Sequence, residues 1–475
     1  MSGRLIVVSN RVPTGAPSGG LVVALHECLS ARGGIWVGTS GELVDSPGTE
    51  LRQMQADPYE IKVFDLTHDE HRDYYAGYAN SVLWPLCHRR IDLLELSRQY
   101  YATYRAVNER LARMLAAHIQ PDDRVWIHDY HFLPLAGCLR ALGVTAKLGY
   151  FHHIPFPTET DLRALPEGED LLDWLSDYDL VGLQTQGDVA AALDIYRRHT
   201  DGEQFLTGDV LFRGRLVALR SFPIGIDADR FASQAGHEDG RAMMRLRENE
   251  KLVIGVDRLD YSKGLPNRLQ AFGAYLDRAA PDAPRTTLLQ IAPPSRGDVE
   301  AYREIRAEME HIAGHVNGLH AQIGWTPIQY LHRALSRDQI ASLYRAADAA
   351  LVTPLADGMN LVAKEFIAAQ DPEDPGVLIL SQFAGAAEQL SEAVIVNPHD
   401  IQALAQAVDT ALNMPRSERV KRHAALRAAV FDKDIDHWTH CYLEALDRAG
   451  EPELKELEER VKSETGSTPL ATAAG

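Results

Sequence analysis

The chain has 475 residues, of which 45% are hydrophobic and 24% are charged, a composition typical of an ordinary globular protein with two or three domains. Its formal net charge of −19 argues against nucleic acid and against an anionic membrane surface as partners. No apolar run approaches the roughly 20 residues that span a membrane, and the four scattered cysteines predict reduced core thiols in a cytoplasmic protein.

A strand-like run opens the chain and ends in Ser9-Asn10-Arg11, so the first ten residues lack the layout of a signal peptide. A glycine-rich loop that includes Gly19 and Gly20 follows, and it leads into a helical run over 21–30. Free amides at a helix start and the helix dipole both suit a phosphate. An ordinary turn from loop to helix is the alternative interpretation.

Aromatic residues gather before the next predicted elements, at Tyr74-Tyr75 and at Trp84. Aromatic faces stack on sugar rings, although packing in the core is the usual role of such side chains. A helix is predicted over 101–118.

Histidines follow the next two predicted strands, in His128-Asp129-Tyr130-His131 and in His152-His153. A metal site is one interpretation, but a third ligand at the usual spacing, an HExxH motif and a cysteine pair are all missing. We therefore predict no metal. Contacts from Asp129 and His153 to sugar hydroxyls fit better, with purely structural roles left open for the other histidines.

Basic residues follow two strands of the second half. Arg258 and Lys263 lie in Arg258-Leu259-Asp260-Tyr261-Ser262-Lys263-Gly264, directly after the strand predicted at 252–256. Two cations at a strand's carboxyl end suit a diphosphate, the arginine as a bidentate fork and the lysine as a point charge. Arg296 has the same placement after the following strand, and with Arg11 it could grip one phosphate ester. Solvated surface charge is the alternative for any one of them.

The stretch from Asp357 to Glu365 is the most informative of the chain. It follows a buried strand, turns at Gly358 and enters a helix predicted over 361–370, which makes a second site for an anion. Asp357 and Glu365 bracket this helix start. A ligand that carries both phosphate and sugar hydroxyls would satisfy the amides and the carboxylates together.

Alternation of apolar strands with helices predicts an α/β protein of two Rossmann-like, doubly wound domains that face a central cleft. The expected bounds are 1–227 and 228–434, with a helix at about 435–455 that packs back on the first domain and a frayed tail at 456–475. A charged helical segment is expected over 239–250. The predicted strands are Leu5–Val8, Arg124–His128, Lys147–Phe151, Leu180–Leu183, Leu252–Val256, Thr287–Ala292, Ala350–Val352 and Val377–Leu380.

Together, these strings resemble the trehalose-6-phosphate synthase family, retaining glycosyltransferases of family 20 with the GT-B fold. The resemblance runs from Arg4 to about Trp438. It implies transfer of glucose from UDP-glucose to glucose 6-phosphate, which gives α,α-trehalose 6-phosphate and UDP without a metal or other cofactor. It rests on Val8–Arg11, Ser18–Leu21, Val82–Pro85, His128–His131, His153–Pro157, Arg258–Gly264, Pro294–Arg296 and Asp357–Glu365.

The resemblance also implies roles for individual residues, with the acceptor held by the first domain and the nucleotide sugar by the second. The implied catalytic residues are Arg258, Lys263, Asp357 and His153. The implied donor-binding residues are Gly19, Gly20, Arg258, Lys263, Leu335, Leu361, Val362, Ala363, Lys364 and Glu365. The implied acceptor-binding residues are Arg11, Tyr75, Trp84, Asp129 and Arg296.

Two other functions stay open at this point. Thr39 stands where some relatives carry a second tryptophan, so a sister transferase that uses another phosphorylated acceptor, such as glycerol 3-phosphate, is one alternative. A catalytically inactive regulatory homologue is the other, although the intact Arg258, Lys263, Asp357 and Glu365 argue against it. UDP, ADP and GDP all remain candidates, and the relatives imply a homo-oligomer, a dimer or a tetramer.

Overall fold

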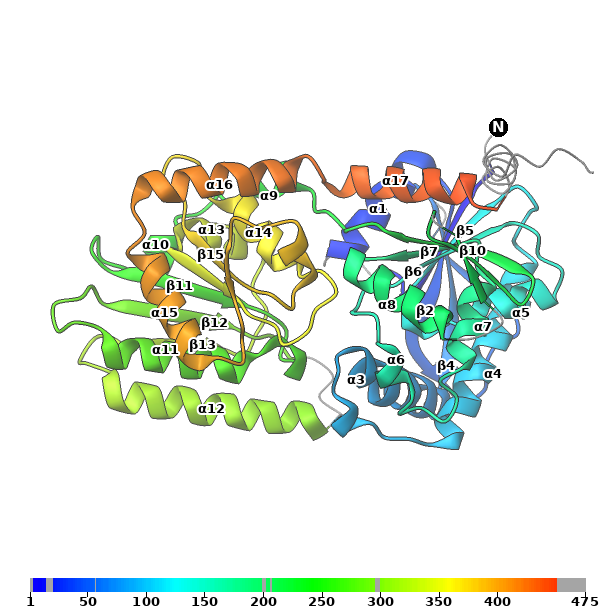
Figure 1. Cartoon of the computed structure of the whole chain (residues 1–475), viewed down its shortest axis with the longest axis horizontal. Coiled ribbons are helices and arrows are strands. Elements are labelled where there is room, and N and C mark those ends of the chain that lie inside the picture. Colours follow the sequence, from blue (N-terminus) through cyan, green and yellow to red (C-terminus); the bar gives the residue numbers. More distant parts are fainter. Residues whose placement is uncertain are drawn as a thin grey trace, which may run out of the picture.

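The computed structural model describes residues 3–13, 20–55, 57–198, 202–205, 207–294 and 300–450. They form two lobes that lie side by side, each built around a mainly parallel sheet with helices on its faces (Figure 1). The predicted α/β architecture of two doubly wound domains is confirmed, and a strand is present at each of the eight predicted positions. Within the described ranges, no helix is both long enough and apolar enough to cross a membrane.

Among the residues that the structure describes, the N-terminal lobe holds a ten-stranded sheet in the order β3-β4-β2-β1-β5-β6-β7-β10-β9-β8. Its central strands are parallel, and the antiparallel pairs β3–β4, β9–β10 and β8–β9 lie toward the two edges. The strands are β1 Leu5–Arg11, β2 Ile35–Val44, β3 Arg52–Gln55, β4 Glu60–Thr67, β5 Arg124–His128, β6 Lys147–Phe151, β7 Leu180–Leu183, β8 Gly202–Gln204, β9 Asp209–Phe212 and β10 Arg215–Ser221. The helices are α1 Gly20–Arg32, α2 His68–Glu70, η1 His71–Leu83, α3 Trp84–Cys87, α4 Arg98–Ala116, α5 Leu135–Ala141, α6 Glu159–Leu162, α7 Asp170–Ser176 and α8 Gln186–Arg197.

In the described part of the C-terminal lobe, a six-stranded, all-parallel sheet has the order β13-β12-β11-β14-β15-β16. Its central strands are buried along nearly their whole length, which explains their continuous apolar sequences. The strands are β11 Lys251–Val256, β12 Thr286–Ile291, β13 Ile328–Leu331, β14 Ala349–Val352, β15 Val377–Ser381 and β16 Val394–Val396. The helices are α9 Ala228–Gln234, α10 Gly240–Met243, α11 Leu265–Arg278, α12 Glu300–His320, α13 Arg337–Ala346, α14 Leu361–Ala369, α15 Ile401–Leu412 and α16 Arg416–Phe431.

The chain crosses between the lobes after β10 and again before α17 (Ile435–Arg448), which runs back over the N-terminal lobe (Figure 1). The hydroxyl of Tyr442 on α17 donates to the carbonyl of Tyr150, 3.0 Å away. The two crossings touch, because a Cβ placed on Gly225 would lie 2.2 Å from the carbonyl carbon of Asp434. The tail predicted at 456–475 lies outside the described residues.

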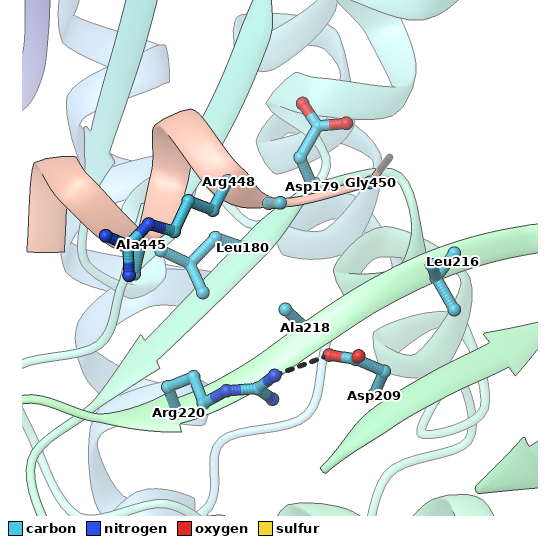
Figure 2. Close-up of a pocket in the computed structure, with 10 residues that line it drawn as sticks. Asp179, Leu180, Asp209, Leu216, Ala218, Arg220, Ala445, Arg448 and Gly450 are labelled. Atoms are coloured by element: carbon cyan, nitrogen blue, oxygen red, sulfur yellow. Dashed lines mark hydrogen bonds and ion pairs between the residues drawn. The ribbon is translucent and has the colours of Figure 1, made fainter. Parts of the chain in front are cut away.

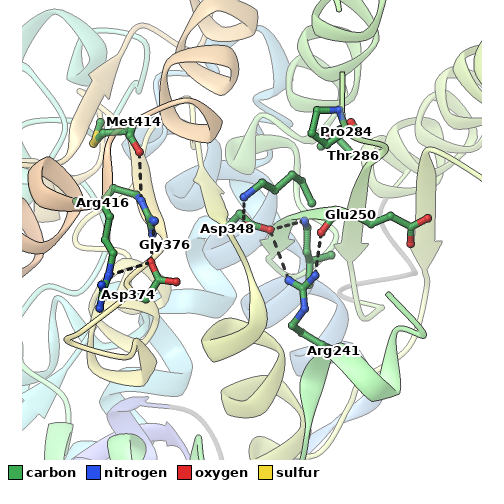
Figure 3. A network of polar contacts seen from close by, with 12 residues as sticks. Arg241, Glu250, Pro284, Thr286, Asp348, Asp374, Gly376, Met414 and Arg416 are labelled. Carbon is green, nitrogen blue, oxygen red and sulfur yellow. Dashed lines mark hydrogen bonds and ion pairs between the residues drawn. The ribbon is translucent and has the colours of Figure 1, made fainter. Parts of the chain in front are cut away.

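The helix expected over 239–250 is wrong in its extent, since only α10 forms there. Of its four residues only Gly240 is buried, so no apolar face supports a longer helix. The segment folds back instead: the Arg241 guanidinium donates to the carbonyls of Arg247 and Glu250, both at 2.9 Å, and lies 3.9 Å from Asp348 (Figure 3). The charged residues of this segment, which predicted a helix, therefore stabilise a turn by hydrogen bonding to its backbone carbonyls.

An unexpected π-helix, η1, carries the aromatic group of the first half. Its hydrogen bonds span five residues, as in the bond from the Trp84 amide to the Ala79 carbonyl. Such helices are rare, and they occur frequently at functional sites. Here η1 buries Tyr74 and Tyr78 in the core. It leaves Tyr75 only partly covered, close to the carboxyl end of β1.

Candidate active site

Most of the predicted site residues follow the carboxyl ends of strands in the two sheets, where ligands of doubly wound domains bind. The lobes make contact at this edge, and we call the region the lobe junction. A Cβ on Gly358 of the C-terminal lobe would lie 2.2 Å from the carbonyl oxygen of His153. The Arg90 guanidinium also lies 5.4 Å from the ring centre of Tyr261. The site is therefore assembled from both lobes.

Lys263 and Asp357, both predicted to be catalytic, form an ion pair at the lobe junction. The Lys263 Nζ lies 2.5 Å from Oδ2 of Asp357, and their side chains are only 12% and 14% exposed. The Nδ2 of Asn360 donates to the same carboxylate oxygen at 3.0 Å. The Asp357 carboxylate fixes the position of the lysine side chain. The lysine cation then lies beside any anion that binds at the lobe junction.

The loop between β11 and α11 presents both predicted cations. Asp260 accepts from the Ser262 amide at 2.9 Å, and Gly264 takes a φ of 63°, a left-handed conformation that favours glycine. This turn starts α11 and places Lys263 inward. Arg258 is exposed, and within the described residues its guanidinium has no hydrogen-bond or ion-pair partner. It is available to a ligand.

A buried polar network lies beneath this loop. The fully buried Arg268 on α11 donates to Asp257 at 2.8 Å, to Gln290 at 3.0 Å and to Thr353 at 3.1 Å. These partners follow or end β11, β12 and β14, so the arginine ties three strand ends together. Burial raises the pKa of the Asp257 carboxyl despite the opposing charge of Arg268. Sequence reasoning missed this network, because Arg268 resembles an ordinary surface residue of a helix.

The start of α14 offers backbone amides to a ligand. Asn360 takes a φ of 74° and caps the helix by accepting from the Ala363 amide at 3.4 Å. The amides of Leu361 and Val362 precede the first hydrogen bond within the helix, and they point outward along its axis. Leu335 comes two residues before α13, a helix that packs against α14.

Lys364 and Glu365 on α14 differ in direction and partners. The Lys364 Nζ is buried and donates to the carbonyl of Ile224 in the first crossing at 2.6 Å, so only its backbone faces the helix start. Burial lowers the pKa of Lys364 to about 7. Glu365 has no hydrogen-bond partner among the described residues, and burial, opposed by Arg337, raises its pKa to about 7. Its carboxyl is free to accept from ligand hydroxyls.

Replacement of Glu365 with glutamine is expected to raise the melting temperature of the ligand-free protein at pH 8 but not at pH 4.5. The folded state binds this proton more tightly than the unfolded state does, so stability falls as the pH rises from 4.5 to about 7. At pH 8 the buried charge costs up to about 3 kcal/mol, which glutamine removes. Thermal unfolding at both pH values measures the difference, with the exposed Glu373→Gln as control. Equal shifts at both pH values would contradict the prediction.

Three of the predicted acceptor residues gather in the N-terminal lobe. The Arg11 guanidinium lies 5.7 Å from the ring centre of Tyr75, and this ring stacks on His131 with centres 5.9 Å apart. The buried ring of Trp84 lies 5.9 Å from that of Tyr130. The arrangement offers a cation bordered by aromatic faces, as a phosphorylated sugar requires.

Asp129 and His153 form a second group beside this one. Asp129 has a φ of 74°, uncommon for a residue with a side chain, and its Oδ1 accepts from the His153 amide at 3.3 Å. Nδ1 of His128 lies 3.0 Å from Nε2 of His153. Burial lowers the pKa of His153 to about 3, so the imidazole is neutral at neutral pH and acts as a hydrogen-bonding group. In the described ranges, no three His, Cys, Asp or Glu side chains are arranged to hold a metal ion.

Gly19 and Arg296 lie outside the described residues, and Gly20 is the first residue of α1. A cavity of about 200 Å³ in the N-terminal lobe lies beside the end of α17, and its lining includes none of the predicted site residues that the structure describes. In Figure 2, Arg220 reaches across this cavity to donate to Asp209 at 2.8 Å. Its lining therefore has its own ion pair and is separate from the lobe junction.

Comparison with known proteins places these features in one family. The profile described as Glycosyltransferase family 20 matches residues 8–448. A protein named trehalose-6-phosphate synthase from Cronobacter sakazakii is 43% identical over 450 residues, which cover 93% of this chain and 95% of that protein.

Two solved structures are similarly close. A UDP-forming α,α-trehalose-phosphate synthase from Burkholderia xenovorans in complex with glucose-6-phosphate has a TM-score of 0.89 and 40% identity, and the match covers 94% of this chain and 100% of that one. An Escherichia coli structure, described as bound with UDP-2-fluoro glucose, has a TM-score of 0.91 and 42% identity over the same shares of the two chains.

Proposed function

The chain belongs to glycosyltransferase family 20, and on that premise we propose that the lobe junction is the active site at which it transfers glucose from UDP-glucose to glucose 6-phosphate. The transfer retains the configuration at the donor carbon and yields α,α-trehalose 6-phosphate and UDP. The bound compounds named for the two related structures, glucose-6-phosphate and UDP-2-fluoro glucose, support the acceptor and the donor. The Lys263–Asp357 ion pair, packed against the N-terminal lobe, is the observation that carries the proposed site.

The chemistry follows from the charges at this junction. As the bond between glucose and the diphosphate breaks, negative charge develops on the leaving phosphate. Arg258 and Lys263 are positioned to neutralise it, which is electrostatic stabilisation aimed at the transition state. Asp357 and the neutral His153 are placed to hold hydroxyls of the transferred glucose. The free carboxyl of Glu365 suits the ribose hydroxyls of the nucleotide, and the amides of Leu361 and Val362 suit its phosphates.

A kinetic test compares acceptors on the purified full-length chain. UDP release is measured with UDP-glucose and either glucose 6-phosphate or glycerol 3-phosphate, and the product is identified by mass. We expect glucose 6-phosphate to be preferred by kcat/KM. A preference for glycerol 3-phosphate would assign the chain to the sister activity, and no UDP release with either would favour an inactive homologue. ADP-glucose and GDP-glucose as competing donors fix the nucleotide.

Replacement of Arg11 with alanine is expected to raise the KM for glucose 6-phosphate tenfold or more and to change the KM for UDP-glucose less than twofold. We propose that Arg11, Tyr75 and Arg296 hold the acceptor phosphate, and a hydrogen bond to a charged group is worth about 1.5–3 kcal/mol. Steady-state kinetics with each substrate varied in turn gives both constants. The matched control is Arg32→Ala, an exposed arginine at the far end of α1. Equal increases in both constants would contradict the assignment.

We also propose that no metal ion takes part, because Arg258 and Lys263 supply the positive charge that a metal would otherwise provide. Dialysis against EDTA should then leave kcat unchanged. A cytoplasmic enzyme that forms a dimer or a tetramer is proposed as well. The four cysteines are free thiols, which suits a reducing compartment.

A further inference from the structure

Glu388 joins the two lobes beside the active site. It lies on η5 (Gly385–Glu388) of the C-terminal lobe, and its carboxylate reaches the first turn of α8 in the N-terminal lobe. Oε2 accepts from the Gln186 amide at 3.0 Å, and Oε1 accepts from the Gly187 amide at 3.1 Å. A carboxylate is favoured at a helix start, because the amides there lack partners and the dipole is positive.

The segment that carries Glu388 is bonded to the loop that carries Asp357. The Asp357 amide donates to the Phe383 carbonyl, and the Gly385 amide donates to the Asp357 carbonyl, both at 3.1 Å. The Ala386 amide donates to the Met359 carbonyl at 2.8 Å. Residues 357–360 and 383–388 therefore behave as one backbone unit, and whatever fixes Glu388 fixes Asp357.

The N-terminal lobe holds its own side of the same contact. Asp188, in the first turn of α8, accepts from the Phe156 amide at 3.0 Å, which ties the helix start to the segment that begins at His153. His153 in turn packs against Gly358, where no side chain fits. The contacts thus close a ring from Glu388 through α8 and His153 to the Asp357 loop and back. A cavity of about 240 Å³ lies within it, lined by both lobes.

We propose that Glu388 is a positioning residue for the glucosyl transfer, which keeps the Asp357 loop at its working distance from His153 by fastening the C-terminal lobe to α8. The inference rests on the proposed function of the lobe junction. Both oxygens of the exposed Glu388 carboxylate accept from the α8 amides, so we infer that the residue acts through the Asp357 loop. Without it the remaining contacts of the ring still form, but the two lobes separate more readily at this edge.

The test compares Glu388→Ala and Glu388→Gln in the full-length enzyme. Glu388→Ala is expected to lower kcat/KM about five- to tenfold, and by the same factor for both substrates, because it removes two charge-assisted bonds at an exposed helix start. Glu388→Gln should recover part of the loss, since its amide oxygen still accepts one bond. The dissociation constant of UDP should change less than twofold, because the nucleotide is held by the C-terminal lobe. Glu392→Ala is the matched control, an acidic residue of the same segment that faces Arg422 4.0 Å away.

Hydrogen exchange supplies a readout that does not depend on activity. In Glu388→Ala the amides of Gln186 and Gly187 should exchange faster, while in Glu392→Ala they should not. Unchanged exchange and unchanged kcat/KM would overturn the proposal, as would a loss confined to one substrate. If the wild-type enzyme fails to use glucose 6-phosphate but these amides still respond, the proposed function is wrong and the fastening of the lobes stands.

Discussion

Lys263→Ala is expected to lower kcat by ~10²–10³-fold, the typical effect of removing one group that stabilises developing negative charge. Two effects act in the same direction. The lysine cation is lost next to the leaving phosphate, and the Asp357 carboxylate, which was 2.5 Å from Nζ, is left with an uncompensated charge that repels the diphosphate. The KM for glucose 6-phosphate should stay within about twofold, because Lys263 is not among the residues proposed to hold the acceptor.

The control for this variant is Lys251→Ala. Lys251 also pairs with an aspartate, Asp348 at 2.8 Å, but it lies at the amino end of β11, the end opposite to the loop of Lys263. Its replacement should leave kcat unchanged. Steady-state kinetics and a binding measurement with UDP separate the chemical step from donor affinity. A normal kcat for Lys263→Ala would remove this residue from the catalytic machinery.

Asp257→Asn is expected to destabilise the C-terminal lobe by about 3–5 kcal/mol, which is the usual loss when one partner of a buried ion pair is removed. Asparagine keeps the shape of the side chain, so the loss comes from the charge. Arg268 is wholly buried, and a guanidinium does not release its proton, so its charge is left without compensation. Urea unfolding followed by circular dichroism measures the change in free energy.

Arg268→Met should cost less than Asp257→Asn at pH 5.5, because the orphaned carboxyl of Asp257 can bind a proton. Burial already raises the pKa of this group in the native protein, and loss of the arginine raises it further. The folded variant then binds the proton more tightly than the unfolded chain, so its stability falls as the pH rises toward 8. Asp257→Asn should show only the smaller fall that Glu365 gives to both variants. Equal behaviour of the two variants across this range would contradict the argument.

Sequence patterns predicted the regular elements of this fold, the strands that alternate with helices. Continuous apolar runs identified the central parallel strands, because such strands are buried on both faces. The rule that ligands bind beyond the carboxyl ends of parallel strands then grouped Arg11, His153 and Lys263, which are far apart in the chain. Their position at the carboxyl ends of strands was enough to predict the candidate site.

Other features depend on contacts that no periodicity records. The pairing of Lys263 with Asp357 joins two loops of one sheet, and neither loop reveals its partner. Lys364 lies in the most informative stretch of the sequence, yet its side chain points to the Ile224 carbonyl and away from the helix start. Glu388 does not directly follow a strand, and it belongs to none of the sequence motifs that predicted the site. The prediction of a helix over 239–250 was wrong because the Arg241 guanidinium hydrogen-bonds to backbone carbonyls and stabilises a turn there.

The path of α17 affects how the protein folds during its synthesis on the ribosome. Tyr442 and Trp438 complete the apolar cover of β5 and β6, although they are made some 300 residues later than those strands. The N-terminal lobe is synthesised first, so the apolar surface that α17 covers on β5 and β6 stays exposed until nearly the whole polypeptide has left the ribosome. A chaperone that shields this surface during translation would raise the yield of the full-length enzyme. Truncation before α17 should leave the earlier half aggregation-prone.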